Sequence, residues 1–213
     1  MSDIAANAIT RKPSLLSRLV RRIILMIWNA KGWTVDGDVP RDIKKYVIAG
    51  APHSSNWDIV FFVGATAEKG ITPNIIAKHT LFNWPIGRFM YDMGGIPIDR
   101  RKRANYVEQV AEAFATRDEL QLVLAVEGTR TTDGSWKSGF YHMARAAKVP
   151  IVPAWVCNKR KILGFGPPFE TTGNYGQDLL KIAQFMRSKI PDYERYKVLE
   201  QQALDIIAGK RES

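Results

Sequence analysis

Apolar and polar residues follow one another along this chain in a pattern that predicts alternating helices and short strands. Between residues 14 and 28, apolar side chains recur three or four positions apart, which is the spacing of one helix face. Further along, short apolar runs bounded by glycine, proline or asparagine are typical of buried strands. Strands are predicted at 46–50, 74–77, 96–98, 121–126 and 151–156, and helices at 14–28, 58–68, 81–93, 104–117, 139–148, 177–188 and 192–207.

This alternation predicts an α/β protein in which a mixed, mostly parallel sheet is flanked by helices. The chain has 213 residues and shows no internal repeat, low-complexity linker or break in composition, so one domain is expected. We assign residues 33–213 to that domain and residues 1–32 to an amphipathic helix that precedes it. Pro85 falls inside the helix predicted at 81–93 and is expected in its first turn, where proline is tolerated.

The N-terminal helix carries Arg18, Arg21 and Arg22 between its apolar residues. Its longest apolar run, at 23–28, is too short to cross a bilayer, which needs about 20 residues. The helix can lie in the membrane interface, with its arginines at anionic headgroups, or its apolar face can pack on the protein's own core. Both can hold for different parts of that face, which consists of Leu15, Leu16, Leu19, Val20, Ile23, Ile24, Ile27 and Trp28.

The formal net charge is +10, from 31 basic and 21 acidic residues. It predicts attraction to an acidic partner: nucleic acid, an anionic membrane surface or an acidic carrier protein. No nucleic-acid-binding motif is recognisable, and the N-terminal helix offers its basic residues a lipid partner, so we expect no nucleic-acid partner. The single cysteine, Cys157, excludes an intramolecular disulfide, and the three histidines lack ligand spacing, so we expect no metal site.

His53 and Asp58 are the first candidates for chemistry, because they flank the start of the helix predicted at 58–68. With the histidine in a turn and the aspartate in the first helical turn, the carboxylate can accept a hydrogen bond from one ring nitrogen. That bond leaves the other nitrogen free to take a proton, as a general base does. The alternative interpretation is a loop histidine and a helix-capping aspartate without a joint role.

Three further segments fall where predicted strands and helices meet, which is where such sheets place their active sites. In the run 94–100, Gly95 allows a close backbone approach and Arg100 can bind a phosphate through its planar guanidinium group. In the run 127–130, the amides of Gly128 and Thr129 can surround an anion, and Arg130 adds a second planar donor. The run 149–153, Val-Pro-Ile-Val-Pro, is a rigid entry to a strand.

Taken together in this order, the four segments resemble the blocks of the lysophospholipid acyltransferases, the family that includes 1-acylglycerol-3-phosphate and glycerol-3-phosphate acyltransferases. The family's His-x4-Asp block corresponds to His53 and Asp58, and its block ending in Ile-Asp-Arg to residues 98–100. Its Glu-Gly-Thr-Arg block corresponds to residues 127–130, and its Val-Pro-x-x-Pro block to residues 149–153. The resemblance covers roughly half of the chain and implies the family's α/β fold.

The resemblance also implies a mechanism. His53, oriented by Asp58, deprotonates an acceptor hydroxyl, which attacks the thioester of acyl-CoA or acyl-carrier protein without a further cofactor or metal. Asn56 shapes the hydroxyl pocket, and Glu127 orients an arginine or the glycerol backbone. The remaining implied substrate-binding residues are Gly95, Arg100, Gly128, Thr129 and Arg130, the two arginines holding the acceptor phosphate.

The expected reaction is acylation of 1-acylglycerol-3-phosphate to phosphatidic acid by a protein bound peripherally at the cytoplasmic face of the cell membrane. Two departures from the family pattern affect the pocket: Pro52 replaces the asparagine common before the histidine, and residues 125–126 are Ala-Val instead of Phe-Pro. One alternative is another acceptor, such as a lyso-ornithine lipid. The other is a non-catalytic accessory protein that binds lipid.

Overall fold

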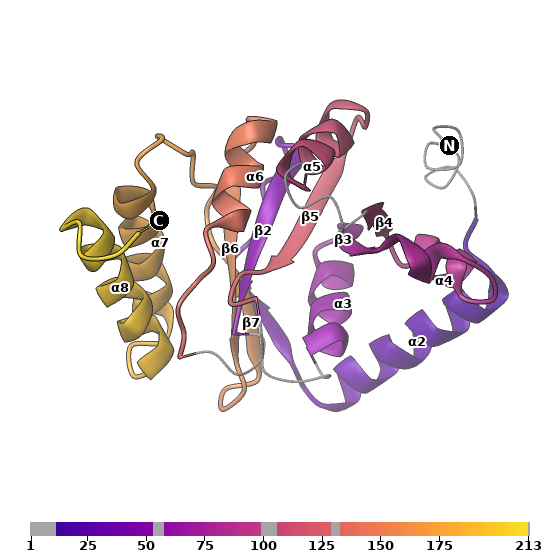
Figure 1. Ribbon diagram of the computed structural model, residues 1–213. Helices are drawn as coiled ribbons and strands as arrows, with labels where there is room; N and C mark the ends of the chain where they lie inside the picture. The colour runs from indigo at the N-terminus through magenta and orange to yellow at the C-terminus, as the bar shows by residue number, and fades with distance from the viewer. Residues whose placement is uncertain (1–11, 53–57, 99–105, 129–132, 213) are drawn as a thin grey trace.

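A seven-stranded sheet forms the centre of the molecule (Figure 1). The computed structural model describes residues 12–52, 58–98, 106–128 and 133–212. In space the strands run in the order β1-β7-β6-β2-β5-β3-β4. Every neighbouring pair is parallel except β6 and β7, which are antiparallel. The strands are β1 (Thr34–Asp36), β2 (Lys45–Ala51), β3 (Pro73–Lys78), β4 (Gly95–Ile98), β5 (Leu120–Ala125), β6 (Ile151–Cys157) and β7 (Ile162–Phe165).

Helices cover both faces of this sheet, with α7 and α8 on one side and α3 and α2 on the other (Figure 1). The period of two in β2 explains the division: Val47 and Ala49 belong to the core under α5 to α8, whereas Tyr46 and Ile48 belong to the core under α2 and α3. The helical elements are α2 (Leu15–Ala30), α3 (Asp58–Glu68), the 3-10 helix η1 (His79–Phe82), α4 (Gly87–Asp92), α5 (Tyr106–Ala115), α6 (Gly139–Ala147), α7 (Tyr175–Lys189) and α8 (Glu194–Ile207).

The structure confirms the predicted fold class, a mixed and mostly parallel α/β sheet. It corrects the helix predicted at 81–93, which is divided into η1 and α4 by a turn at residues 83–86. Pro85 lies in that turn and not in the first turn of a long helix, because proline disfavours the helical conformation in the residue before it. Strands β1, at one edge of the sheet, and β7, its neighbour, were not predicted.

The N-terminal helix α2 packs against α3 through a close backbone approach. Trp28 of α2 is 3% exposed, and its ring lies over Gly64, where a Cβ atom would come within 2.3 Å of the ring. The start of α2 is tied to the end of α4, since the Asp92 carboxylate accepts hydrogen bonds from the Ser14 amide (2.9 Å) and the Ser17 hydroxyl (2.7 Å). Burial raises the pKa of Asp92, but these hydrogen bonds outweigh it, and the net effect is a lowered pKa.

Candidate active site

The described ends of three parallel strands lead into the blocks singled out in the sequence. Ala51 ends β2, Ile98 ends β4 and Ala125 ends β5, and all three strands run in the same direction. The pairing register places Gly50 opposite Ala125, and continuing it through β3 places Ile98 at the level of Ala51. The three ends therefore meet at the carboxyl edge of the sheet, with β4 roughly 14 Å from β2.

Most of the predicted catalytic and phosphate-binding side chains lie outside the described residues. They are His53, Asn56, Arg100, Thr129 and Arg130. Asp58 is the first residue of α3, as the sequence predicted, although its side chain also lies outside the description. Along the chain, the first predicted block therefore falls between the end of β2 and the start of α3.

Glu127 lies two residues after the end of β5 and is one of the most deeply buried charged residues, at 1% exposure. One of its carboxylate oxygens accepts a hydrogen bond of 2.9 Å from the guanidinium group of Arg195, in the first turn of α8. The family resemblance implies that Glu127 orients an arginine or the glycerol backbone, and in the structure Glu127 contacts an arginine that lies outside the four blocks. A buried carboxylate paired in this way holds the start of the third block in a defined position.

Tyr196, the next residue of α8, makes a similar contact with the strand that precedes the first block. Its buried hydroxyl donates a hydrogen bond of 3.1 Å to the carbonyl of Ala51, the last residue of β2. Burial, followed by the neighbouring Tyr193 and Glu127, raises the pKa of Tyr196 well above its ordinary value, so the hydroxyl remains a donor. Adjacent residues of one helix therefore hold the strand ends that lead into two different blocks.

Two further contacts connect α8 to the segment after the third block. Gln202 exchanges a pair of hydrogen bonds with the backbone of Trp136, accepting from its amide at 2.8 Å and donating to its carbonyl at 2.9 Å. Gly134 adopts a φ of +111°, and a Cβ atom there would come within 2.8 Å of the Arg195 backbone. We call the contacts that Arg195, Tyr196 and Gln202 of α8 make with these segments the α8 brace.

No pattern in the sequence identified the α8 brace. The residues that Arg195 and Tyr196 contact are 68 and 145 positions away in the chain, and the Glu-Arg-Tyr sequence at the start of α8 matches no motif. The only local signal is an arginine beside an aromatic residue in an amphipathic helix, which is common on protein surfaces.

The two predicted glycines have local structural roles. Gly128 has a φ of +75°, a conformation that favours glycine, and its amide donates to the Ala125 carbonyl at 3.1 Å. To bind an anion, that amide would have to release this bond. Gly95 is the first residue of β4, at the end opposite to Ile98, and a Cβ atom there would come within 2.9 Å of the Phe82 ring. Its role in binding substrate stays a prediction.

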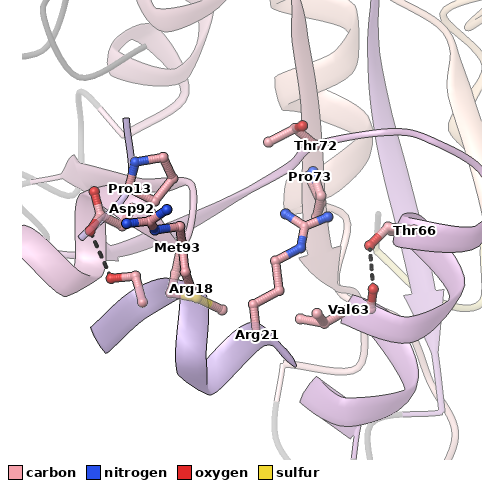
Figure 2. A pocket seen from close by; sticks show the side chains of 10 residues that line it. Pro13, Arg18, Arg21, Val63, Thr66, Thr72, Pro73, Asp92 and Met93 are labelled. Carbon is pink, nitrogen blue, oxygen red and sulfur yellow. Dashed lines mark hydrogen bonds between the residues drawn. The ribbon is translucent and has the colours of Figure 1, made fainter. Parts of the chain in front are cut away.

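A pocket lies away from the carboxyl edge, between α2, α3, the start of β3 and the end of α4 (Figure 2). Arg18 and Arg21 reach into it from α2, while Pro73 and Met93 are among its apolar residues. Pro73 begins β3 and Lys78 ends it, so about 16 Å of strand separates this pocket from the carboxyl edge. The pocket is therefore distinct from the candidate active site.

Two features are absent from the described part of the chain. No helix there is both long and apolar enough to span a membrane. The described residues also contain no group of three or more His, Cys, Asp or Glu side chains that could hold a metal ion.

The sheet order, the direction of its strands and the blocks that follow them define an α/β protein of the acyltransferase fold. Residues 34–157 match the Acyltransferase family, which is more than half of the chain. The protein therefore belongs to this family.

Curated relatives include a 1-acyl-sn-glycerol-3-phosphate acyltransferase of Limnanthes alba, 33% identical over 135 residues, which are 61% of this chain and 47% of the relative. The Escherichia coli enzyme of the same name is 28% identical over 207 residues, covering 84% of this chain and 80% of the relative. The crystal structure of the 1-acyl-sn-glycerophosphate acyltransferase of Thermotoga maritima is similar in fold, with a TM-score of 0.55, 16% identity and coverage of 87% and 85%. The chain spans about half the length of the Limnanthes relative.

Proposed function

We propose that this protein is an O-acyltransferase that moves a fatty acyl group from a thioester donor to the free hydroxyl of 1-acylglycerol-3-phosphate, giving phosphatidic acid. The observation that carries the proposal is the carboxyl edge of the sheet. The strands that lead into the His-x4-Asp, Ile-Asp-Arg and Glu-Gly-Thr-Arg blocks end there at nearly the same level. Membership of the Acyltransferase family and the names of the relatives support the same reaction.

In this proposal His53 takes the proton of the acceptor hydroxyl while Asp58 orients its ring. The hydroxyl oxygen forms a bond to the thioester carbonyl carbon, and the carbon–sulfur bond breaks as the intermediate collapses. The leaving thiolate takes the proton back from His53, which restores the neutral base. Arg100 and Arg130 hold the acceptor phosphate through paired hydrogen bonds. The donor is acyl-CoA or acyl-carrier protein, and the net charge of +10 is compatible with either acidic molecule.

The proposed place of this reaction is the cytoplasmic face of the cell membrane, with α2 as the peripheral contact. The apolar face of α2 supports the membrane contact, because only part of that face packs on the protein and the rest is exposed to solvent. Ile24 and Trp28 are turned toward the protein, whereas Leu15 and Leu19 are 77% and 56% exposed. Exposed leucines on a basic helix fit the interface of an anionic bilayer.

The experiment incubates the purified protein with an acyl-CoA or an acyl-carrier protein and a panel of lysolipids, and identifies the products by mass spectrometry. His53→Ala is the test variant. His142→Ala is the matched control, because His142 is an exposed histidine of α6 outside the four blocks. We expect phosphatidic acid from the wild type and the control, and a loss of at least about 100-fold in the test variant.

The acceptor is tested separately with Arg100→Ala and Arg130→Ala. If phosphate binding is their role, each raises the KM for 1-acylglycerol-3-phosphate more than it lowers kcat. Acylation of only a lysolipid without a phosphomonoester, such as a lyso-ornithine lipid, would overturn the proposed acceptor and leave the chemistry in place. Full activity of His53→Ala would overturn the proposed base, and vesicle binding without turnover on any donor would assign the protein to lipid binding alone.

A further inference from the structure

The outer side of α2 presents an apolar surface to solvent. Its exposed members are 41% to 77% accessible and fall within an arc of about 100° at 3.6 residues per turn. Arg18 and Arg22 border this arc on one side. The exposed apolar members are Leu15, Leu16, Leu19, Ile23 and Met26.

A second apolar surface lies in the segment of residues 81–86, which comprises the end of η1 and the turn before α4. Trp84 is 93% exposed, and Leu81 and Ile86 are 40% and 47% exposed. A tryptophan side chain is rarely so exposed to solvent, because its ring has a large apolar area to bury. Three large apolar side chains within six positions of a surface turn are a cluster, and such clusters mark contact sites.

The two surfaces belong to connected elements. The 81–86 segment leads directly into α4. Asp92, at the end of α4, accepts hydrogen bonds from Ser14 and Ser17 at the start of α2. Pro13 and Met93 line the same pocket between these elements. Figure 1 shows α4 beside the N-terminal half of α2 at one end of the molecule. The turn that carries Trp84 is therefore fixed relative to α2.

The charge of this end of the molecule is positive. Residues 12–31 include five basic residues and no acidic one, and residues 77–92 include two basic residues and one acidic residue, Asp92. The salt bridges in the described part of the chain do not involve Arg18, Arg21 or Arg22. An apolar surface bordered by cations suits a partner that is apolar inside and anionic outside. A bilayer of anionic phospholipid has these properties.

We propose that the 81–86 segment, with Trp84 at its centre, is a second membrane contact beside α2, and that its partner is the interface of an anionic phospholipid bilayer. Tryptophan is suited to this position because its ring is apolar and its indole N–H reaches the headgroup region. Two contacts fix the tilt of the protein on the membrane, which a single interfacial helix does not. The inference extends the proposed membrane association and does not require catalysis.

Tryptophan fluorescence tests the contact directly. Trp28, Trp33, Trp136 and Trp155 are at most 8% exposed, so Trp84 dominates the response of the described tryptophans to solvent. With vesicles of phosphatidylcholine and phosphatidylglycerol we expect a blue shift and quenching by brominated lipid. Both effects should be smaller in Trp84→Phe, which removes the indole and keeps an apolar ring, because any response of Trp57, which lies outside the described residues, is common to both proteins.

Vesicle sedimentation measures the contribution of each contact. We expect Trp84→Ala to weaken binding about tenfold and Leu19→Ser to weaken it to a similar degree, as loss of one buried apolar side chain does. Leu204→Ala is the control, because Leu204 is a 44% exposed leucine of α8, on the other side of the sheet (Figure 1). It should bind like the wild type. Vesicles of phosphatidylcholine alone should bind all variants weakly.

Binding by Trp84→Ala equal to that of the wild type, with no blue shift in the wild type, would overturn the inference and leave the contact through α2 intact. A Trp84-dependent dimer in solution that does not bind vesicles would overturn it as well and assign the surface to a second copy of the chain. If the wild type binds no vesicles, both this inference and the proposed membrane association fail. The transfer assay described above reports on the chemistry separately.

Discussion

Glu127 illustrates how a single buried charge can hold a site together. Its carboxylate is 1% exposed and pairs with Arg195, whose side chain is 25% exposed. Removing one member of a fully buried ion pair costs about 3–5 kcal/mol, and the partial exposure of Arg195 reduces that value. We therefore expect Arg195→Ala to lower the free energy of unfolding by about 2 kcal/mol in urea denaturation.

Arg187→Ala is the control for that measurement. Arg187 pairs with Glu200 between α7 and α8, with 46% of its own side chain exposed. A pair of this kind contributes at most about 1 kcal/mol. Equal effects of the two substitutions would contradict the special role of Glu127.

The same variant also tests Arg195 as a positioning residue for the proposed transfer reaction. Arg195→Ala should lower kcat with little change in the KM for the acyl donor, because the third block loses its fixed position while the binding groups remain. Arg195→Lys should restore part of kcat, since it keeps the charge but not the planar fork. A kcat unchanged by Arg195→Ala would limit this residue to a role in stability.

Two buried tyrosines give a matched comparison of one hydrogen bond. The Tyr196 hydroxyl donates to Ala51, whereas the Tyr46 hydroxyl has no partner among the described residues. Tyr196→Phe should lower the free energy of unfolding by about 1–2 kcal/mol, because it leaves a buried carbonyl unpaired. Tyr46→Phe should be neutral or slightly stabilising. Thermal and urea unfolding of both variants checks this, and the reverse order would contradict the hydrogen-bond assignment.

At the residue scale, the sequence predicted correctly the positions of those residues that belong to a short local motif. Asp58 begins α3 and Glu127 follows β5, as the blocks predicted. Arg195 and Tyr196 could not be predicted, because their partners come from strands far away in the chain and only the folded sheet brings them together. The spacing of residues within one segment does not indicate such long-range contacts.

At the scale of elements, the packing of α2 on α3 depends on the missing side chain of Gly64. A glycine inside a helix usually costs about 1 kcal/mol relative to alanine, so Gly→Ala would ordinarily stabilise α3. Here the added Cβ atom would meet the Trp28 ring at 2.3 Å. We expect Gly64→Ala to destabilise the protein by about 1–3 kcal/mol, as overpacking does, and to speed hydrogen exchange in α2.

Gly139 of α6 provides the opposite case. A Cβ atom there meets only the end of the Met143 side chain, at an ordinary 3.7 Å. Gly139→Ala should therefore leave stability unchanged or raise it slightly. If both substitutions stabilise the protein, Trp28 does not limit the distance between α2 and α3.

The accuracy of the predicted elements followed their length and the clarity of their pattern. Helix α3 was predicted with its observed bounds, and α7 and α8 to within two residues at each end. Strands β1 and β7, of three and four residues, were not predicted, although β4, also of four residues, was. The prediction of one helix at 81–93 was wrong at its centre, where a turn that contains Pro85 separates η1 from α4.

At the scale of the whole molecule, parallel strands explain why blocks spread over 78 residues, from His53 to Arg130, can serve one site. Their carboxyl ends share an edge, and the order β2-β5-β3-β4 places the three strand ends close together. The sequence predicted a mostly parallel sheet, but not its strand order. That order depends on which hydrophobic faces pack together, and the two cores on opposite sides of β2 become visible only in the structure.

Those two cores lead to a prediction about alkaline pH. Burial raises the pKa of Tyr46 to about 12, and it also raises the pKa values of Tyr175 and Tyr196, which lie in the other core. Unfolded tyrosine loses its proton near pH 10. Above that pH the unfolded chain releases protons that the folded chain retains, so stability is intact below pH 10 and falls as the pH rises toward 12.

The fall should be steep because tyrosines on both faces of the sheet contribute, each with up to about 1.4 kcal/mol per pH unit. Tyr46→Phe removes the contribution of one core. We expect it to match the wild type at pH 7 and to lose stability less steeply between pH 10 and 12, as urea unfolding across that range will show. An unchanged slope would mean that Tyr46 reaches water before the protein unfolds, so that the core under α2 and α3 opens separately from the core under α5 to α8.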